Sequence, residues 1–286
     1  MNRDKTIAVT SDWHGNFKYG LMNPNVVLYD EDEAGNLKPY SPKPTATQEY
    51  LWHLHVDRII PEVKEYSKGT DLILLSLGDP THGNHFMNEL VSTRQGDQIE
   101  IALSNFMPWY ELSNLVSARF AIGTENHEFG EGTATHLIAN SLAREFKNID
   151  TKALNYGLAN INGVTISFAH HGPGAGSRVW LEGNTATWHL RSRMMDDIMR
   201  GKKPPDLYLY GHVHTYVNVL LQMQEYESRL IICPSMCVMS GFARKATKSN
   251  YIVQNGVVLF RVTADGQLSK PHTIIEELDL RTKEVL

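Results

Sequence analysis

Apolar runs with strand character alternate with helix-period segments through the first half of this 286-residue chain, and this alternation restricts the fold most. Strands are expected at residues 6–11, 72–77 and 119–122. Helices are expected at residues 48–66, 99–116 and 136–146, with a kink at Pro108. Because parallel strands need a crossover that is usually helical, this βαβαβ order favours a mostly parallel sheet covered by helices.

The second half of the chain changes character and predicts a second sheet. Asn162-Gly163 is a two-residue hairpin signal, and strand patterns dominate from Asp206 to Arg261, with turns expected at Asn255-Gly256 and Asp265-Gly266. We therefore expect an α/β fold of two packed mixed sheets flanked by helices. A single domain over residues 1–286 is expected, with a loop excursion at about 18–46, including a surface loop at 30–44, and an Arg/Trp-containing segment at about 172–203.

Composition excludes some classes of protein. With 42% apolar residues and a formal charge of −5, the chain does not resemble one that coats nucleic acid through bulk charge, although a local basic groove is still allowed. Its apolar runs are far shorter than a membrane span, and the first residues enter a strand pattern without a signal peptide, which favours the cytoplasm. Cys233 and Cys237 are expected to be reduced, structural thiols.

Polar residues follow five of the expected strands. In chain order they are Asp12-Trp13-His14, Gly78-Asp79, Glu125-Asn126-His127-Glu128, His170-His171 and Gly211-His212-Val213-His214. Each fragment alone is better explained by a turn or by packing than by a site. Ligands gather beyond the carboxyl ends of strands in α/β folds, however, so all five together indicate one site. Carboxylate, imidazole and amide groups suit divalent ions such as Mn²⁺, Fe²⁺, Zn²⁺ or Ni²⁺. Two such ions with a bridging carboxylate would serve phosphate chemistry.

The ordered motifs "DWH", "GD", "NHE", a strand-terminal His and "GHVH" resemble the calcineurin-like metallophosphoesterase superfamily, in its phage and bacterial form. The resemblance runs from Asp12 to His214. It implies a four-layer α/β/β/α sandwich and a hydrolase that binds two divalent metal ions, with Mn²⁺ as the first choice. Its reaction would be attack on phosphorus by a metal-bridged hydroxide.

The resemblance also implies a role for each matching residue. Asp12, His14 and His214 would hold the first metal, and Asp79 would bridge the two. The second metal would be held by Asn126, His212 and one of the adjacent pair His170-His171, with His170 favoured and His171 left as a substrate contact. His127 would act as the catalytic acid or electrostatic clamp, and His82 would support it.

Two departures from the superfamily pattern bear on the substrate. Glu125 stands where a Gly is usual, and Gly123-Thr124 are expected to absorb the turn. His82 replaces the Asp of the phosphoprotein phosphatases, and no Arg follows it, which resembles the double-strand-break repair nucleases. An Arg at this position would bind a terminal phosphate dianion through two N–H groups. Its absence therefore favours diesters or nucleotides as substrates.

The segment after His171 carries Arg178 and Arg191 together with Trp180 and Trp188, and resembles phage-type members of the superfamily. Arg and Trp together suit single-stranded nucleic acid, so Arg178 and Arg191 are candidate substrate contacts. The alternative is a surface helix with its Trp in the core and its Arg in solvent.

Three functions follow from these residues. The first is a phosphodiesterase or nuclease acting on nucleic acid or nucleotides. The second is a phosphomonoesterase acting on a nucleotide, metabolite or phosphoprotein, and the third is a catalytically silent protein-binding scaffold. The pair Asn84-His85 is expected to lie outside the site, because only Asn126-His127 follows the third strand. The sequence does not indicate an oligomeric state.

Overall fold

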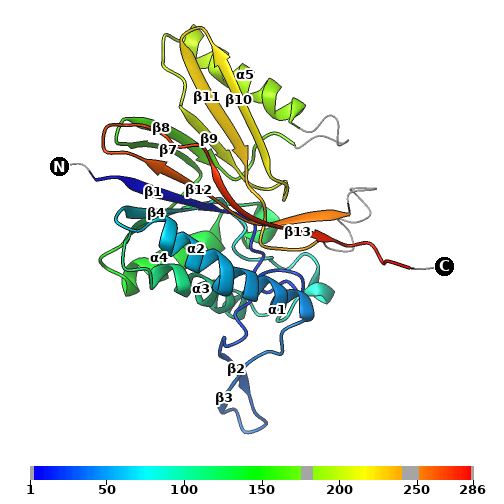
Figure 1. The fold of residues 1–286 in the computed structure, drawn as a ribbon. Coiled ribbons are helices and arrows are strands. Elements are labelled where there is room, and N and C mark those ends of the chain that lie inside the picture. Colours follow the sequence, from blue (N-terminus) through cyan, green and yellow to red (C-terminus); the bar gives the residue numbers. More distant parts are fainter. Residues whose placement is uncertain (1–2, 175–182, 240–250, 285–286) are drawn as a thin grey trace.

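Two β-sheets packed face to face form the centre of the computed structural model, which describes residues 3–174, 183–239 and 251–284 (Figure 1). The first sheet has the order β13-β12-β1-β4-β5-β6, with β1, β4, β5 and β6 parallel and β12 and β13 antiparallel to their neighbours. Its strands are β1 (Lys5–Thr10), β4 (Asp71–Ser76), β5 (Leu115–Ala121), β6 (Asp150–Leu154), β12 (Ile252–Val262) and β13 (His272–Asp279).

The second sheet has the order β10-β11-β9-β8-β7, with a parallel centre and antiparallel edges. Its strands are β7 (Tyr156–Ile161), β8 (Val164–Ala169), β9 (Leu207–Tyr210), β10 (Val217–Met223) and β11 (Tyr226–Ile232). The expected hairpin at Asn162-Gly163 joins β7 to β8, and both turn residues have the positive φ that this turn requires (50° and 95°). This prediction is confirmed.

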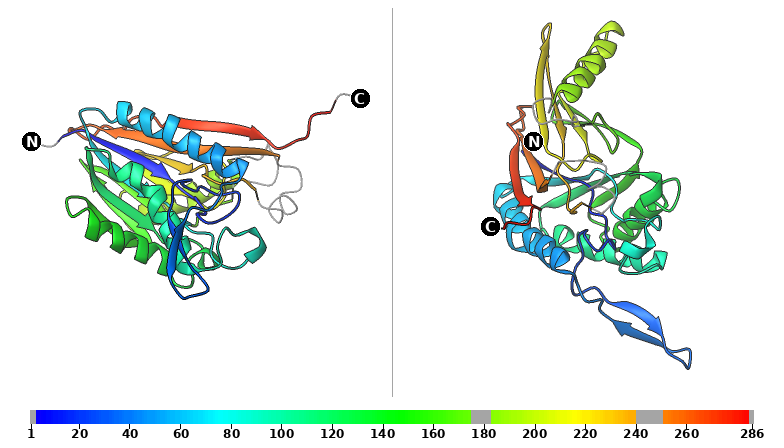
Figure 2. Two further views of the ribbon diagram at one scale, coloured as in Figure 1. Left: turned by 90° about the horizontal axis from the view of Figure 1, so that it is seen from below. Right: turned by 90° about the vertical axis from the view of Figure 1, so that its right-hand side faces the viewer.

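Helices cover the outer face of each sheet and complete four layers. The first sheet is covered by α1 (Ala46–His53), the π-helix η1 (Leu54–Ile59), α2 (Ile60–Tyr66), α3 (Gln95–Tyr110) and α4 (Thr133–Glu145). The second sheet is covered by α5 (Asn184–Met199), which packs on β10 and β11. The expected α/β/β/α sandwich is confirmed, and the views in Figure 2 show the same layering.

The space between the sheets is filled by alternate side chains of the central strands. Ile7 and Val9 of β1 point to the second sheet and meet Phe168 and Leu209 there, whereas Ala8 between them faces the helices. Because β1 is buried on both faces, its sequence is a continuous apolar run rather than an alternating one.

The helix expected at 48–66 forms in three connected parts. Thr45 and Gln48 make a capping box at its start, each side chain accepting from the backbone N–H of the other. The π-helical turn η1 ends directly before α2, whose first turn contains Pro61. Proline lacks the N–H that an uninterrupted α-helix would bond, so the chain widens at this point.

Two predictions about element boundaries and turns are wrong. The helix expected at 99–116 ends at Tyr110, because the run from Leu115 pairs with β4 as a strand. Asn255-Gly256 is not a turn but lies inside β12, where the Asn255 side chain donates to the carbonyls of Ser235 and Cys237. The turn at Asp265-Gly266, in contrast, is confirmed, with Gly266 at φ 87°.

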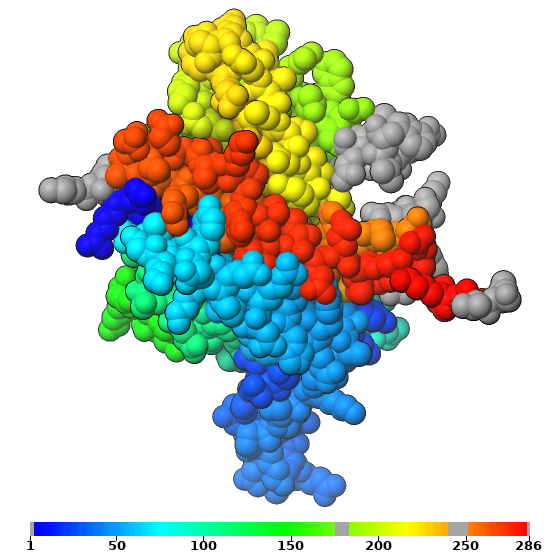
Figure 3. All heavy atoms as spheres, viewed as in Figure 1, coloured from blue at the N-terminus to red at the C-terminus, as the bar shows by residue number. Residues whose placement is uncertain are grey.

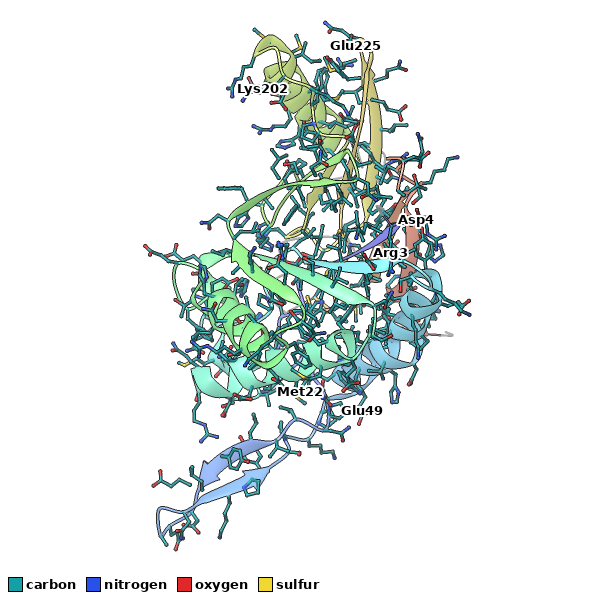
Figure 4. All side chains as sticks on the ribbon, turned by 90° about the vertical axis from the view of Figure 1, so that its left-hand side faces the viewer. Arg3, Asp4, Met22, Glu49, Lys202 and Glu225 are labelled. Carbon is teal, nitrogen blue, oxygen red and sulfur yellow. The ribbon has the colours of Figure 1, made fainter. Side chains whose placement is uncertain are left out.

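The segment expected to be a surface loop at 30–44 instead contains a two-stranded hairpin, β2 (Leu28–Glu31) and β3 (Leu37–Tyr40). It projects from the helical side of the molecule as a separate arm in the space-filling view (Figure 3). Met22 and Glu49 lie near its base, and Lys202 and Glu225 lie at the opposite end of the molecule (Figure 4). None of the described helices is long and apolar enough to span a bilayer.

Candidate metal centre

Five strands end at one edge of the sandwich, and the residues of the predicted site follow them. β1, β4 and β5 are parallel in the first sheet, as are β8 and β9 in the second. Contacts join the two sets of loops: the backbone N–H of His212 donates to Asp12 Oδ2 (2.9 Å), and His170 Nε2 lies 3.1 Å from Asp79 Oδ2. The carboxyl ends of both sheets therefore supply one centre.

The backbone of this edge is unusual. Ten described residues other than glycine have positive φ, and half of them belong to the predicted ligands: Asp12 (54°), His14 (45°), Asp79 (52°), His212 (71°) and His214 (59°). A left-handed backbone costs an L-residue roughly 1–2 kcal/mol, and such residues cluster at functional sites. The packing of the five loops therefore holds these side chains in conformations that the isolated chain would avoid.

The first group of donors consists of Asp12, His14 and His214. Asp12 Oδ1 lies 3.1 Å from His214 Nε2 and 3.8 Å from His14 Nε2, and the two imidazole nitrogens are 3.3 Å apart. A point equidistant from the three atoms lies about 2.0 Å from each, which is the usual length of a bond from zinc or a similar ion to nitrogen or oxygen. These residues therefore fit a divalent cation.

The second group lies around Asp79. The donor atoms of Asp12, Asp79 and His170 lie within 4.8 Å of one another, as do those of His170, His171 and His212. Asp79 belongs to the same cluster as Asp12, so it is placed to be shared between two positions. His171 is exposed, with its ring centroid 4.7 Å from that of His170 and 4.5 Å from that of His212, whereas His170 is buried against Asp79.

Hydrogen bonds behind the donors fix their orientation. His170 Nδ1–H donates to the Leu77 carbonyl (2.6 Å), which turns Nε2 towards Asp79. Ser11 Oγ donates to Asp12 Oδ2, and the backbone N–H of Thr124 donates to Asp79 Oδ1 (2.6 Å). Such outer contacts select the imidazole tautomer and hold the carboxylate, as they do in metal sites.

Two glycines allow the loops to approach this closely. A Cβ on Gly123 would lie 2.0 Å from Asp79 Oδ1, and a Cβ on Gly78, where φ is 97°, would lie 2.5 Å from His170 Nδ1. Both contacts are impossible for another residue. Backbone strain is absent at Glu125, because Glu125 is not among the described residues with positive φ.

Burial and mutual charge shift the ionisation of the cluster. Burial raises the pKa of Asp12 and Asp79, but neighbouring histidines outweigh it, and the pKa of each carboxyl is lowered. Burial lowers the pKa of His170, yet Asp79 and Asp12 raise it to about 9. His14 has its pKa lowered by burial and by His127 and His214. The centre thus holds two carboxylates among several imidazoles, a donor set that suits ions of borderline hardness.

His127 lies beside this cluster. Its Nδ1–H donates to the backbone carbonyl of His82 (2.6 Å), and its Nε2 lies 4.0 Å from Asp79 Oδ2. His127 is also one of three histidines, with His14 and His82, whose donor nitrogens lie within 4.8 Å of one another. The side chain is 19% exposed, so it combines a fixed orientation with access from solvent.

His82 contacts His127 through its backbone carbonyl and through its ring, whose centroid lies 5.0 Å from that of His127. Its imidazole stacks on Phe17 (centroids 4.1 Å apart), and its Nδ1 lies 3.2 Å from His14 Nδ1. Burial, followed by the charge of His127, lowers the pKa of His82 to about 3. Nε2 of His82 is buried and has no hydrogen-bond partner among the described residues.

The two Asn-His pairs have different surroundings. Asn84 accepts from Gln98 of α3, and His85 is exposed. Asn126 and His127 lie in the short 3₁₀ helix η3 (Glu125–His127) after β5. The His127 ring reaches the Asp/His cluster, whereas the Asn126 side chain is exposed, and none of the hydrogen bonds among the described residues involves it.

Glu128 is buried and structural. Its carboxylate accepts from the backbone N–H of Gly123 (2.8 Å) and from the N–H (2.8 Å) and hydroxyl (2.6 Å) of Thr135 in the first turn of α4. These bonds hold the loop from β5 to α4 and thereby place His127. Burial raises the pKa of Glu128.

The Arg/Trp segment only partly falls within the described residues. Arg178 and Trp180 lie outside them. Arg191 is exposed on α5, with its guanidinium 5.1 Å from the centre of the Trp188 ring, and Trp188 is 66% exposed, so the expectation of a Trp in the core is wrong for Trp188. No hydrogen bond, ion pair or ring contact between described residues joins Arg191 to the Asp/His cluster.

Two neighbours of the centre carry no motif, and sequence reasoning did not find them. Thr124 Oγ1 lies 3.1 Å from His170 Nε2 and 3.3 Å from His212 Nδ1. Cys237 is a buried free thiol whose Sγ lies 3.3 Å from His214 Nδ1, whereas Cys233 lies in the apolar core between the sheets. The sequence signal for Thr124 is its place in the short loop between the third strand and the Asn-His pair.

No protein-family model and no curated protein matches this sequence. Solved structures do match. The Thermus thermophilus sulfate thiohydrolase SoxB is 12% identical and has a TM-score of 0.38, with 98% of this chain and 57% of SoxB covered. A metallophosphoesterase from Sphaerobacter thermophilus is 11% identical with a TM-score of 0.35 (94% and 88% covered), and Chaetomium thermophilum Vps29 is 9% identical with a TM-score of 0.30 (97% and 98% covered). At these scores none of them supports an inference about activity, which must rest on this chain's own residues.

Proposed function

We propose that this chain is a phosphoesterase that depends on two divalent metal ions. The observation that supports the proposal best is the convergence of Asp12, His14 and His214 on a point about 2.0 Å from each, with Asp79 in the adjacent cluster. Donors from both sheets meet at this edge, and few structural roles would require so many buried polar groups there.

The residues divide between two positions. Asp12, His14 and His214 would hold the first ion, and His170 and His212 the second, with Asp79 between them. When bound, such ions activate a water molecule and neutralise charge on the phosphoryl oxygens. Asn126 is the ligand that the motif adds to the second position. His212 has contacts to the cluster, whereas no hydrogen bond among the described residues joins the Asn126 side chain to it.

His127 is proposed to transfer a proton at the leaving oxygen. Its Nδ1–H is committed to the His82 carbonyl, so Nε2 is the nitrogen that faces the cluster and exchanges protons. Phe17 and His82 support this arrangement. Their rings stack, which fixes His82, and the backbone carbonyl of His82 accepts the hydrogen bond from His127.

A diester is the proposed substrate class, with nucleic acid or a nucleotide as the source. The loop that follows β4 carries no arginine between Asp79 and Asn84. The residue that binds a terminal phosphate dianion in phosphoprotein phosphatases is therefore absent from this position. A phosphomonoesterase is the alternative within the same chemistry.

Metal-dependent turnover tests the proposal. The metal-free protein, prepared with a chelator, is given Mn²⁺ with either bis-p-nitrophenyl phosphate or p-nitrophenyl phosphate, and in a separate assay with labelled single-stranded DNA. Turnover should require the metal and should be higher for the diester. Asp79→Asn should lower kcat by about 100-fold or more, because it removes a buried charged donor.

Asp71→Asn is the matched control. Asp71 lies at the opposite end of β4 in a half-buried ion pair with Lys5, far from the cluster, so its substitution should leave turnover within about twofold of the unmodified chain. No metal-dependent turnover of any of the three substrates would contradict the proposal and favour a silent scaffold. A preference for the monoester would overturn only the substrate class.

A further inference from the structure

Thr124 occupies the place that the motif assigns to Asn126. We infer that the Thr124 hydroxyl, rather than the Asn126 amide, completes the ligands of the second metal ion. This inference rests on the proposed function and names a ligand that the motif does not contain.

Thr124 Oγ1 stands between two of the proposed ligands. It is 3.1 Å from His170 Nε2 and 3.3 Å from His212 Nδ1, and the same His170 Nε2 is 3.1 Å from Asp79 Oδ2. Two donors bound at about 2.1 Å to one ion lie about 3.0 Å apart in octahedral geometry and about 3.4 Å apart in tetrahedral geometry. All three separations fall within this interval, so each of these three pairs of atoms already has the spacing of neighbouring ligands.

The backbone of Thr124 is also fixed to the centre. Its N–H donates to Asp79 Oδ1 (2.6 Å), and it caps η3 in an extended conformation (φ −73°, ψ 133°) without strain. The approach depends on Gly123, where any side chain would collide with Asp79. Thr124 therefore contacts the proposed bridging carboxylate and two imidazoles at once.

Asn126 lies two residues further along, and its side chain is exposed. Its backbone carbonyl packs so closely on Gly83 that a Cβ there would lie 1.9 Å from the oxygen. Thr81 Oγ1 donates to the carbonyl of His127, which fastens the same turn to the loop after β4 (2.6 Å). The backbone of Asn126 is thus held in η3 against the loop after β4, and no hydrogen bond among the described residues joins its side chain to the cluster.

A ligand set with Thr124 in place of Asn126 has the same kind of donor atoms. A threonine hydroxyl and an asparagine amide each offer one neutral oxygen, so replacing one by the other leaves the charge of the centre unchanged. Neutral oxygen beside carboxylate and imidazole suits ions such as Mn²⁺. Two residues, Thr124 and Glu125, separate Gly123 from the Asn-His pair, and the first of them lies against Asp79.

Metal stoichiometry tests the inference without reference to activity. Mn²⁺ binding is measured by titration calorimetry on the metal-free full-length protein, and bound metal is measured by elemental analysis after desalting. Thr124→Val keeps the shape and the backbone N–H but removes the hydroxyl. It should bind one ion as the unmodified chain does and the second at least about 10-fold more weakly.

Thr124→Ser and Asn126→Ala are the matched variants. Thr124→Ser keeps the oxygen and should bind two ions, as should Asn126→Ala. Circular dichroism of each metal-free variant confirms that it is folded. Loss of the second ion in Asn126→Ala, or two tightly bound ions in Thr124→Val, would overturn the inference. An unmodified chain that binds no Mn²⁺ would instead contradict the proposed function itself.

Discussion

At the scale of the residue, two histidines that each follow an asparagine lie in different surroundings. His85 and His127 both follow an asparagine, but His85 is exposed, whereas His127 lies with Nε2 4.0 Å from Asp79 Oδ2. The difference arises from their loops. The loop after β4 places Asp79 at the centre and then runs outward, and the loop after β5 returns to the same place.

His127→Gln and His85→Gln form a matched pair that tests this difference. His127→Gln should lower kcat by about 10²- to 10⁴-fold, because a positioned proton donor is lost. His85→Gln should leave kcat within about twofold of the unmodified chain, because its side chain lies in solvent. Steady-state kinetics on the diester with saturating Mn²⁺ measures both. Equal effects of the two substitutions would contradict the role given to His127.

At the scale of the element, the helical unit from Ala46 to Tyr66 shows how a local signal and a distant contact combine. The capping box and Pro61 fix its start and its π-turn from within the sequence. His55, in that turn, is buried and accepts from Trp109 Nε1–H of α3 (2.8 Å). Burial lowers the pKa of His55 to about 3, so the ring stays neutral in the folded protein under mildly acidic conditions.

The stability of the protein should therefore depend on pH through His55. The unfolded chain protonates this ring below a pKa of about 6.5, while the folded chain does not until about pH 3, so the contribution is complete above pH 6.5 and is lost as the pH falls. Urea unfolding at about pH 6.5, 5.5 and 4.5 should show a loss from this residue that approaches about 1.4 kcal/mol per pH unit.

His55→Gln keeps an acceptor for Trp109 but does not titrate, so its unfolding free energy should fall less steeply over the same interval. His136→Gln, which replaces an exposed histidine of α4, is the matched control and should follow the unmodified chain. If the unmodified chain and His55→Gln gave parallel dependences on pH, the buried neutral state of His55 would be wrong.

At the scale of the whole molecule, the centre joins two sheets that are otherwise held together by apolar packing. Asp12, His14 and Asp79 come from the first sheet, and His170, His212 and His214 from the second. Hydrogen bonds and imidazole charge stabilise the carboxylates of this edge. A ligand that bridges the sheets stabilises the folded state only.

Metal removal should therefore lower the thermal stability of the whole chain. An ion at about 100 times its Kd adds about 2.7 kcal/mol, which corresponds to a rise in Tm of roughly 4–5 °C for a chain of this size. Scanning calorimetry with Mn²⁺ and with a chelator measures the shift, and His214→Ala should reduce it. A Tm that is the same in Mn²⁺ and in chelator would contradict a metal centre between the sheets.

The sequence alone determined the βαβαβ order, the hairpin at Asn162-Gly163 and the strand ends that carry Asp12, Asp79, His170 and the "GHVH" segment. Apolar periodicity and turn chemistry are local signals, so they can be recognised before the chain folds. The same local signals failed at Val116 and at Asn255-Gly256. There, pairing with β4 and a hydrogen bond to the Ser235–Cys237 loop overrode the local preference.

Only the tertiary structure decided which polar atoms face one another. A sequence pattern shows the order of Thr124, Asn126 and His127, but not which of their side chains turns inward. That choice depends on Gly83 and Gly123, whose contact partners lie far along the chain, and on the left-handed backbone at Asp12 and Asp79. These conformations are unfavourable for the isolated loops, and they exist because the packing of two sheets imposes them.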